Sequence, residues 1–430
     1  MKAVILAAGE GKRLRPITSS TPKPMIPLLG KPLLEHIILG LIDAKINDIL
    51  IIVGYKKEII IDYFETFAKK HNVKIDFITQ SQYLGTAHAA NYAKDYVEEE
   101  FLMMYGDLFV DPEIFKFIIQ KYKEHKYEGL ITLLSVNNPQ DYGIIKLNSK
   151  NLVEDIIEKP SIDKQVGNLA NAGIYIFNQL IFDAIERTQK SIRNEYEFTD
   201  SMQILINKLN GKIFGCTIDK YIWNDIGLPW QIFDVTQFLL DQIQIEINGY
   251  VERNVEIQGN VHIGKGTKVK SGSFIQGPCY IGENNLIGPN AFIRPYTVIE
   301  NDCHIGMSEV KNSVIFSKTA VPHFNYIGDS IICENVNLGA GTKLSNLRFD
   351  NKSVKMKINN KLIDSGRRKL GAIIGPNSQT GINASIMCGK KVGQNSIIGA
   401  HTLVNDDVPP NTLYYQDSYG KLIVKHNIFY

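Results

Sequence analysis

The first 25 residues contain a glycine-rich turn with four cationic side chains around it: Lys12, Arg13, Arg15 and Lys23. Residues 6–16 read Leu-Ala-Ala-Gly-Glu-Gly-Lys-Arg-Leu-Arg-Pro, and Pro-Lys-Pro follows at residues 22–24. Glycine lets the main chain approach a ligand closely with its amide groups pointing inward. Cations around such a turn suit a polyanion, most simply a nucleoside triphosphate. The segment therefore predicts phosphate chemistry.

Two common phosphate-binding motifs do not fit this turn. A Walker A loop needs Ser or Thr after its lysine, but Lys12 is followed by Arg13, and a dinucleotide fingerprint needs glycine where Leu14 stands. An ordinary strand-to-helix turn with solvated charges is the alternative interpretation. The complete string resembles the signature of the sugar-1-phosphate nucleotidylyltransferases, Gly-x-Gly-x-Arg-Leu-x-Pro followed by Pro-Lys-Pro, and this resemblance favours phosphate binding.

The resemblance assigns roles to the residues of the turn. It implies that Arg13 and Lys12 act on the triphosphate and that Lys23 acts on the α-phosphate or the sugar phosphate. Arg13 and Lys23 are therefore the predicted catalytic residues of the first half. The remaining predicted nucleotide contacts in this segment are Leu6, Ala8, Gly9 and Gly11.

Two carboxylates lie in apolar stretches, where a charged group needs a partner or a metal. Asp107 follows the apolar run 101–105, and Asp225 lies in Trp-Asn-Asp-Ile-Gly. Magnesium prefers such oxygen ligands, although a cap or turn aspartate is the alternative for each. The resemblance implies that both aspartates hold Mg²⁺ or a similar divalent cation. The bacterial bifunctional members usually have Asn at this position. Asp225 instead follows the thymidylyltransferase pattern.

Residues 80–89 and three later segments predict base and sugar contacts. We expect Gln80 to pair with a pyrimidine, Gly85 to let the base approach, and Thr86 to cap a helix. A plain capped helix is the alternative, but Leu-Gly-Thr-Ala-His-Ala at 84–89 resembles the uridine-reading loop of N-acetylglucosamine-1-phosphate uridylyltransferases. The same family implies that Glu158 accepts hydrogen bonds from sugar hydroxyls. Its other implied sugar-binding positions are Gly143 and Asn171.

A second set of reactive residues is centred on His323, which we expect in a loop that interrupts a repeat. Histidine titrates near neutrality and can take a proton from an amine, whereas a histidine on a loop is more commonly surface decoration. The order of residues 294–352 resembles the acetyltransferase domain of the bifunctional glucosamine-1-phosphate acetyltransferase/uridylyltransferases. The resemblance implies His323 as general base and acetyl-CoA as acyl donor.

The same resemblance implies the substrate contacts of that domain. The predicted sugar-phosphate contacts are Arg294, Lys311, Tyr326 and Lys352. Asn337 and Asn346 are expected to orient the sugar or thioester, and Ala340 and Ala400 to lie near acetyl-CoA. Residues 349–369 depart from the bacterial pattern, and we expect a loop extending from a coil. Its basic residues 367–369 either reach CoA phosphates or belong to a solvated loop, and we favour the solvated loop.

The elements that position these residues differ between the two halves of the chain. The first 230 residues alternate strand and helix patterns, typical of a mostly parallel sheet with helices on both faces. Ligands bind beyond the carboxyl ends of such strands, where Gly9, Gln80 and Asp107 follow. We predict strands at 4–8, 49–53, 75–79 and 101–105, and helices at 32–44, 58–70, 86–97 and 229–241.

After residue 241 β-branched residues recur every six positions, which is the period of a hexapeptide solenoid with one inward residue per side. The positions are Val251, Ile257, Ile263, Val269, Ile275, Ile281, Ile287, Ile293, Ile299 and Ile305, and the period resumes at Ile374, Thr380, Ile386, Val392, Ile398 and Val404. A rigid spacer is the structural alternative. In the resembling family the solenoid forms trimers.

Composition narrows the class of protein. The chain has 430 residues, enough for about two or three domains. Its net charge of +2 suggests no nucleic-acid or anionic membrane partner. The five cysteines are scattered without Cys-x-x-Cys, no apolar run reaches about 18 residues, and only six apolar residues lie between Lys2 and Gly9, so we expect a cytoplasmic protein.

We therefore expect an α/β fold: an N-terminal Rossmann-like nucleotidyltransferase domain with a mostly parallel sheet, and a C-terminal left-handed parallel β-helix. The expected boundaries are 1–228, a connecting helix at 229–248, the β-helix at 249–410 and a tail at 411–430. The expected activities are acetylation of an amino-sugar-1-phosphate, glucosamine or galactosamine, and uridylyl transfer from UTP. The alternatives are a UTP- or dTTP-dependent enzyme with one activity and a structural solenoid, and a non-catalytic regulatory homologue.

Overall fold

Residues 1–161 and 167–427 are described by the computed structural model. Internal contacts divide the chain into two units. The first unit comprises Met1–Glu10, Pro22–Met25 and Pro32–Asp225, and the second comprises Gly11–Thr21, Ile26–Lys31 and Ile226–Tyr430. The glycine-rich turn is therefore divided, because Gly9 belongs to the first unit and residues 11–15 to the second.

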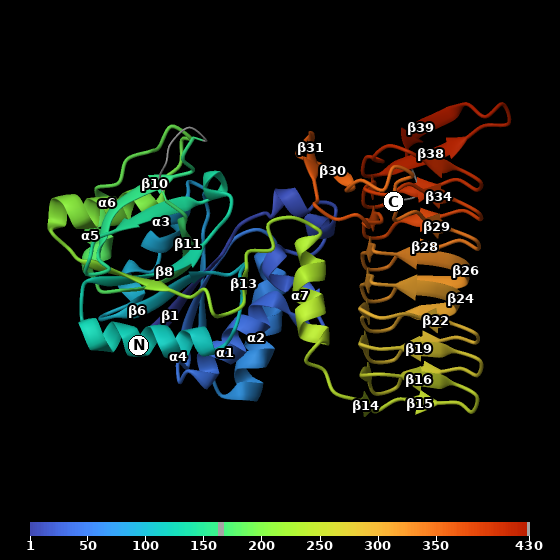
Figure 1. Ribbon diagram of the computed structural model, residues 1–430, viewed down its shortest axis with the longest axis horizontal. Coiled ribbons are helices and arrows are strands. Elements are labelled where there is room, and N and C mark those ends of the chain that lie inside the picture. Colours follow the sequence, from blue (N-terminus) through green and yellow to red (C-terminus); the bar gives the residue numbers. More distant parts are fainter. Residues whose placement is uncertain (162–166, 428–430) are drawn as a thin grey trace. The chain divides into compact units, whose positions relative to one another are not determined.

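The sheet of the first unit contains both parallel and antiparallel strand pairs (Figure 1). The predicted strands β1 (Lys2–Ala7), β4 (Asp48–Val53), β5 (Lys74–Thr79) and β6 (Phe101–Tyr105) pair in parallel in the order β6-β1-β4-β5. Strand β11 (Leu169–Phe177) runs antiparallel to β6, β8 and β9. The parallel sheet is confirmed, although the complete sheet is mixed. Its other strands are β8 (Gly129–Ser135), β9 (Gly143–Leu147), β10 (Val153–Glu158) and β12 (Ile213–Thr217).

Helices cover both faces of this sheet, because alternate side chains of β1 enter different cores. Ala3 and Ile5 pack in one core with α1 (Leu33–Asp43), α2 (Lys57–His71) and α4 (Glu113–His125). Val4 packs in the other core with α3 (Thr86–Asn91), α5 (Leu180–Glu186) and α6 (Phe198–Leu209). The predicted helix 86–97 is shorter than expected, since α3 ends at Asn91 and a 3₁₀ turn follows at Lys94–Tyr96.

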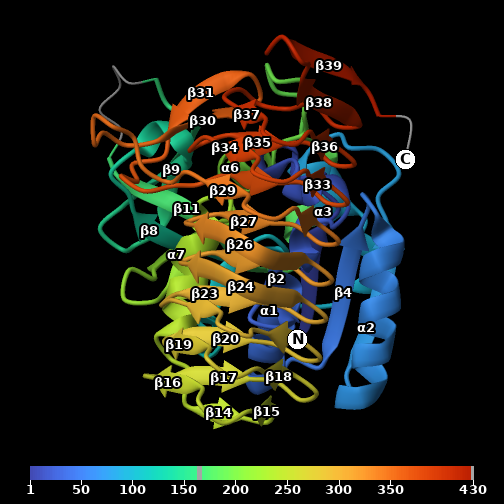
Figure 2. The same cartoon turned by 90° about the vertical axis from the view of Figure 1, so that its right-hand side faces the viewer.

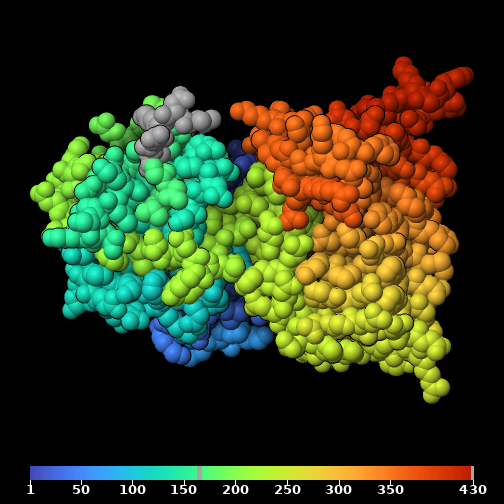
Figure 3. All heavy atoms as spheres, viewed as in Figure 1, coloured from blue at the N-terminus to red at the C-terminus, as the bar shows by residue number. Residues whose placement is uncertain are grey.

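Most of the second unit is a stack of parallel strands wound in turns of 18 residues (Figure 2). In one ladder Val261 of β17 (Val261–Ile263) pairs with Cys279 of β20 (Cys279–Ile281), and Cys279 pairs with Thr297 of β23 (Thr297–Ile299). The colours of Figure 3 follow the sequence along the stack. The residues of the six-residue period from Ile263 onward are buried in one core, as predicted. The short strands outside this ladder segment are β14 (Glu246–Ile247), β15 (Tyr250–Val251), β16 (Glu256–Gln258), β18 (Lys268–Val269), β19 (Phe274–Gln276), β21 (Leu286–Ile287), β22 (Phe292–Ile293), β25 (Val314–Ile315), β27 (Ile331–Ile332), β28 (Asn337–Leu338), β29 (Lys343–Leu344), β32 (Ile373–Ile374), β33 (Gln379–Thr380), β34 (Ser385–Ile386), β35 (Lys391–Val392), β36 (Ile397–Ile398) and β37 (Leu403–Val404).

The coils continue where the six-residue pattern is lost, so the prediction that His323 lies in an interrupting loop is wrong. His323 lies within β26 (Ala320–Gly328), which pairs with β24 (His304–Lys311). Several sides of these turns have five residues instead of six, and a fixed period misses them. The inward residues between Ile305 and Ile374 are Val310, Ile315, Val321, Ile327, Ile332, Leu338 and Leu344.

Residues 349–369 leave the coil, as predicted, and contain an antiparallel hairpin of β30 (Lys355–Ile358) and β31 (Lys361–Asp364). This insertion is not simply solvated, because Met356 is buried and Arg367 forms an ion pair with Asp234. Asp234 lies on α7 (Gln231–Leu240), the predicted helix after the first unit. A second hairpin, β38 (Thr412–Gln416) with β39 (Leu422–His426), occupies the predicted tail. None of the helices in the described part of the chain has the length and apolar character needed to cross a membrane.

Candidate active sites

Lys23 joins the two predicted metal-binding aspartates. Its ammonium group donates hydrogen bonds to Oδ2 of Asp107 at 2.6 Å and to the main-chain oxygen of Asp225 at 2.7 Å. Asp107 follows β6, and Asp225 follows β13 (Trp223–Asn224), which pairs with β7 (Phe109–Val110) and so brings the two aspartates together. The Lys23 side chain is nearly buried, with 6% of the residue exposed. A buried ammonium needs such partners, so this arrangement fixes its position.

The donor set suits a hard cation that also binds substrate phosphates. The Asp107 side chain is 41% exposed, so one of its oxygens is accessible beside the Lys23 contact. Within the described residues no group of three or more His, Cys, Asp or Glu side chains forms a metal cluster. Magnesium commonly takes only one or two carboxylates and completes its shell with water and phosphate oxygens. Asp107 and Asp225 therefore fit Mg²⁺ better than a metal with a full protein cage.

The glycine-rich turn has the backbone form expected of a phosphate loop. Gly11 has a φ of 62°, in the left-handed region, and its carbonyl accepts a hydrogen bond from the Thr18 hydroxyl at 2.9 Å. A Cβ added to Gly9 would meet no atom within 4 Å, so the space beside this residue is open. The Arg13 guanidinium packs against Gly227, with Nη2 3.2 Å from the position of a Cβ there. Lys12 is exposed and lies in the 3₁₀ turn that follows.

The predicted base-reading loop packs against the segment that contains Tyr196 and Phe198. Gly85 has a φ of 117°, and a side chain there would collide with the main chain of Tyr196. Thr86 is the first residue of α3 rather than its cap, so the predicted capping role is wrong. Its hydroxyl instead accepts a hydrogen bond from the Phe198 amide at 2.9 Å. Gln80 is buried, and its side-chain amide faces Nδ1 of His88 at 3.3 Å.

The predicted sugar residues lie on neighbouring strands. Glu158 is opposite Gly143 in the β9–β10 pair, and Asn171 on β11 donates a hydrogen bond to the Tyr175 hydroxyl at 2.8 Å. Nη2 of Arg193 lies 3.1 Å from Oε1 of Glu158 and 3.0 Å from Oε1 of Glu197. Arg193 was not predicted, because nothing in its polar surroundings in the sequence indicates a pairing with Glu158.

Thr199 is a second residue that the sequence did not indicate. Only 8% of it is exposed, and its hydroxyl has no hydrogen-bond partner among the described residues. Its methyl group lies 3.5 Å from the position of a Cβ on Gly143. A buried hydroxyl without a partner beside Gly143 is available to a ligand.

Four predicted substrate contacts of the second unit form one polar cluster. Lys311 pairs with buried Asp329 at 3.1 Å, and Arg294 pairs with Glu309 at 2.7 Å. The Asn346 side-chain amide donates hydrogen bonds to Asp329 and, at 3.3 Å, to the Tyr326 hydroxyl. Burial, assisted by the Asp329 carboxylate, raises the pKa of Tyr326, so its phenol stays protonated as a donor. Glu309 and Asp329 neutralise the two cations and had no predicted role.

His323 lies opposite Met307 in the β24–β26 pair, and its main-chain oxygen accepts a hydrogen bond from Gly341 at 2.8 Å. His304 is a neighbouring histidine on β24 that was not predicted. Burial, and to a smaller extent the nearby His323, lower the pKa of His304, which favours its neutral form. The turn that holds Gly341 also places Ala340 beside the His323 strand.

The three remaining predicted residues of this domain lie on other elements. Asn337 lies on β28, Lys352 in the insertion, and Ala400 on the turn after β36. The Lys352 amide donates a hydrogen bond to Asp350 at 3.2 Å, and Ala400 packs against Gly381. In the described part of the chain none of the three makes a side-chain hydrogen bond to the cluster around Asp329.

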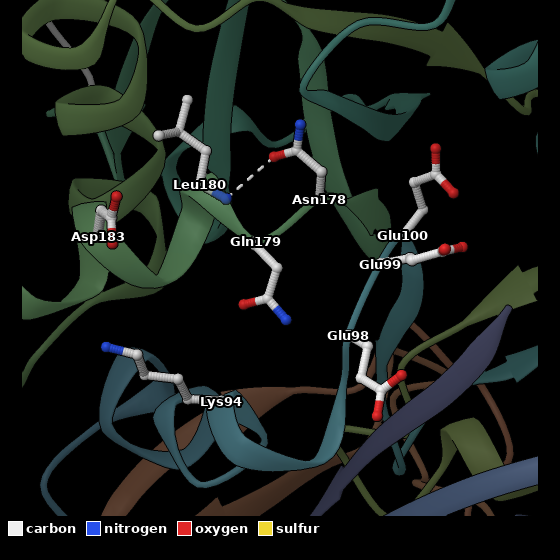
Figure 4. Close-up of a pocket in the computed structure, with 8 residues that line it drawn as sticks. All are labelled: Lys94, Glu98, Glu99, Glu100, Asn178, Gln179, Leu180 and Asp183. Atoms are coloured by element: carbon white, nitrogen blue, oxygen red, sulfur yellow. Dashed lines mark hydrogen bonds between the residues drawn. The ribbon is translucent and has the colours of Figure 1, made fainter.

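A surface hollow of the first unit is separate from these residues (Figure 4). Half of its lining residues are acidic, and the Asn178 side chain accepts a hydrogen bond from the Leu180 amide at 3.0 Å. A carboxylate-rich wall repels phosphates, so this hollow does not fit a nucleotide. The lining residues are Lys94, Glu98, Glu99, Glu100, Asn178, Gln179, Leu180 and Asp183.

Comparison with known proteins identifies the family. Residues 2–242 match the nucleotidyl transferase family model, and residues 275–409 match the GMPPB C-terminal domain. The chain is 45% identical over 417 residues to the bifunctional protein GlmU of Methanocaldococcus jannaschii. The aligned region covers 97% of this chain and 98% of the relative. The chain belongs to the bifunctional GlmU family.

Another member of the GlmU family gives the same result. A protein of Sulfurisphaera tokodaii named bifunctional sugar-1-phosphate nucleotidylyltransferase/acetyltransferase is 44% identical over 413 residues, covering 95% of this chain and 98% of the relative. These relatives confirm the predicted bifunctional transferase and disfavour the alternatives with one activity or none. A UDP-glucose pyrophosphorylase structure in complex with UDP-glucose shares the fold of the N-terminal part, with a TM-score of 0.51 and 23% identity over 56% of this chain and 98% of that chain.

Proposed function

We propose that this GlmU-family enzyme makes a UDP-N-acetylhexosamine in two steps. The C-terminal part transfers an acetyl group from acetyl-CoA to an amino-sugar-1-phosphate. The N-terminal part then joins the product to UTP and releases pyrophosphate. The observation that carries the proposal is the Lys23 ammonium held between Asp107 and Asp225, with a separate polar cluster around Asp329 that includes Tyr326 of the strand carrying His323.

In nucleotidyl transfer an oxygen of the sugar-1-phosphate attacks the α-phosphorus of UTP, and the bond to pyrophosphate breaks. Such reactions depend mainly on positioning and charge neutralisation. Lys23 contacts the transferred phosphate, and Lys12 and Arg13 balance the charge of the triphosphate. Asp107 and Asp225 would hold Mg²⁺, which would supply neutralisation of charge on the phosphate oxygens. Gln80, Gly85 and Thr86 bind the base, with Leu6, Ala8, Gly9 and Gly11 on the nucleotide.

Glu158 is the main sugar acceptor in this proposal. Its Oε1 is paired with Arg193, whereas Oε2 points toward Gly143, where a sugar hydroxyl can donate to it. Asn171 and the unpartnered Thr199 hydroxyl supply further polar contacts for the N-acetyl sugar. This arrangement supports an acetylated sugar phosphate as the acceptor.

In acetyl transfer His323 takes a proton from the sugar ammonium, because only the neutral amine is a nucleophile. The amine nitrogen attacks the thioester carbonyl, the carbon–sulfur bond breaks, and CoA leaves as a thiolate that takes up the proton lost from the nitrogen as the amide forms. Arg294, Lys311, Tyr326 and Lys352 hold the sugar phosphate. Asn337 and Asn346 orient the sugar or the thioester, and Ala340 and Ala400 lie near acetyl-CoA.

Three finer features belong to the same proposal. The coil is a left-handed parallel β-helix, supported by the continuous parallel ladders, and it assembles as a homotrimer. We place the domains at 1–228, 229–248, 249–410 and 411–430. The five cysteines are unpaired, which supports a reducing compartment and hence the cytoplasm.

The two half-reactions test the proposal separately. The full chain is incubated with acetyl-CoA and glucosamine- or galactosamine-1-phosphate, and thiol release is followed. In a second assay it receives UTP or dTTP, Mg²⁺ and an N-acetylhexosamine-1-phosphate, and pyrophosphate is measured. We expect both products, with UTP preferred. Absence of thiol release with both amino sugars would falsify the acetyltransferase assignment, and absence of pyrophosphate would remove the uridylyltransferase.

A further inference from the structure

The segment that carries Lys23 is enclosed in the sequence by parts of the second unit. Pro22–Met25 belongs to the first unit, whereas Gly11–Thr21 before it and Ile26–Lys31 after it belong to the second. Prolines at 22, 24 and 27 restrict φ along this stretch. Because the backbone between the flanks and Lys23 has little conformational freedom, a displacement of either flank also displaces Lys23.

A buried carboxylate of the second unit holds the flank after Lys23. Strands β2 (Pro27–Leu28) and β3 (Lys31–Pro32) form a hairpin whose turn residues Leu29 and Gly30 both have positive φ, of 52° and 81°. The Gly30 amide at this tip donates a hydrogen bond to Oε1 of Glu300 at 3.2 Å. Glu300 follows β23 and is 2% exposed.

The tip also has a close neighbour that fixes its position. A Cβ on Gly30 would collide with the Tyr280 hydroxyl, so only glycine fits there. Tyr280 is held in turn by stacking on His262, with ring centroids 4.8 Å apart. A buried carboxylate is costly to keep in a core without a partner, so the Gly30 contact indicates a role for Glu300 beyond packing.

A second carboxylate holds the flank before Lys23. The Thr21 hydroxyl donates a hydrogen bond to Oε1 of Glu334 at 3.3 Å. The other carboxylate oxygen of Glu334 is buried and has no hydrogen-bond partner among the described residues. Thr21 is two residues before Lys23, so this contact acts on the segment close to the ammonium group.

We propose that Glu300 and Glu334 are positioning residues for nucleotidyl transfer: they hold the two flanks of the segment that presents Lys23. The coil then has a role in the chemistry of the other unit, beyond its own acetyltransferase site. Neither carboxylate touches the substrate in this account, and both act through Lys23. The proposal rests on the role proposed above for Lys23.

The test uses the full chain and both half-reactions. In Glu300→Leu the acceptor is lost, and in Thr21→Val the donor to Glu334 is lost. We expect the kcat of pyrophosphate release to fall about tenfold in each, the loss of one hydrogen bond, while the KM for UTP stays within about twofold. Acetyl transfer by the same preparations should stay within about twofold, which shows that the coil is folded.

Two controls separate positioning from general damage. Glu300→Gln keeps an oxygen acceptor for Gly30 and should retain pyrophosphate release, and Glu256→Leu removes an exposed carboxylate of the same coil and should change neither activity. In a Lys23→Ala background, Glu300→Leu should cause no further loss, because its effect passes through Lys23.

Three results would overturn the proposal: full kcat in Glu300→Leu, full kcat in Thr21→Val, or an undiminished further loss in the Lys23→Ala background. If Glu300→Leu loses acetyl transfer as well, Thr21→Val decides the outcome. Failure of the proposed function is distinct, because wild type would then release no pyrophosphate or Lys23→Ala would release it at the wild-type rate.

Discussion

Nζ of Lys23 lies 2.6 Å from Oδ2 of Asp107. The same ammonium group donates to the main-chain oxygen of Asp225, so one cation joins the two predicted metal-binding residues. A charge fixed in this way needs little reorganisation when negative charge develops on the transferred phosphate.

Lys23→Ala is therefore expected to slow pyrophosphate release by roughly 100-fold or more, because it removes a preorganised cation from the transition state. Steady-state kinetics with UTP and an N-acetylhexosamine-1-phosphate measure the effect. Lys69→Ala, an exposed lysine on α2, is the matched control and should behave as wild type. A Lys23→Ala enzyme with unchanged kcat contradicts the assignment.

Arg193 is expected to set the affinity for the sugar acceptor. Arg193→Ala removes the cation shared by Glu158 and Glu197, so the Glu158 carboxylate is no longer oriented. We expect the KM for the sugar-1-phosphate to rise about fivefold, near 1 kcal/mol, with little change for UTP. The control is Arg187→Ala, at an exposed position after α5. An equal change in both KM values indicates a structural effect instead.

His323→Ala is expected to lower the rate of acetyl transfer by about 100-fold to 10,000-fold, the usual contribution of a general base. Pyrophosphate release from an already acetylated sugar phosphate should remain at the wild-type rate. Thiol release from acetyl-CoA measures the first effect, and His426→Ala, an exposed histidine on β39, is the control. Retention of acetyl transfer in His323→Ala excludes this residue as the base.

Glu300 makes folding stability depend on pH. Burial raises the pKa of Glu300 to about 7, partly opposed by the Gly30 hydrogen bond. Because the folded value lies above the unfolded one, the contribution of this carboxyl to stability is fully present below about pH 4.5 and is lost as the pH rises through about 7. Glu300→Gln does not titrate and removes this loss.

We expect the difference in free energy of unfolding, Glu300→Gln minus wild type, to be about 3 kcal/mol larger at pH 8 than at pH 4.5. Urea unfolding at both pH values measures the difference, and Glu256→Gln, at an exposed position, should show none. If Glu300→Gln and wild type differ in free energy of unfolding by the same amount at both pH values, Glu300 does not titrate in this range.

The sequence was sufficient to predict the place of a residue that belongs to a repeating pattern or that directly follows a regular element. Ile263 and Ile281 are buried because a six-residue period points them inward, and Asp107 follows an apolar strand that is visible in the sequence. The period failed near Val310 because the coil shortens its sides there. The residue pairs Arg193–Glu158 and Gly30–Glu300 join positions far apart in the chain, and no local pattern encodes them.

The division of the glycine-rich turn also depends on tertiary contacts. Gly9 and Gly11 are two residues apart, yet they belong to different units. The local sequence also did not indicate the environment of the basic residues of the insertion. Arg367 pairs with Asp234 on α7 instead of remaining solvated.

We propose that two sites in one chain act in sequence on one sugar. The most direct measurement is product analysis after the full chain is mixed with UTP, Mg²⁺, glucosamine-1-phosphate and acetyl-CoA, with His323→Ala and Lys23→Ala variants in parallel. We expect UDP-N-acetylglucosamine from wild type, none without acetyl-CoA, and accumulation of N-acetylglucosamine-1-phosphate with Lys23→Ala. Formation of the acetylated nucleotide sugar by either variant at the wild-type rate, or its absence with wild type, would contradict it.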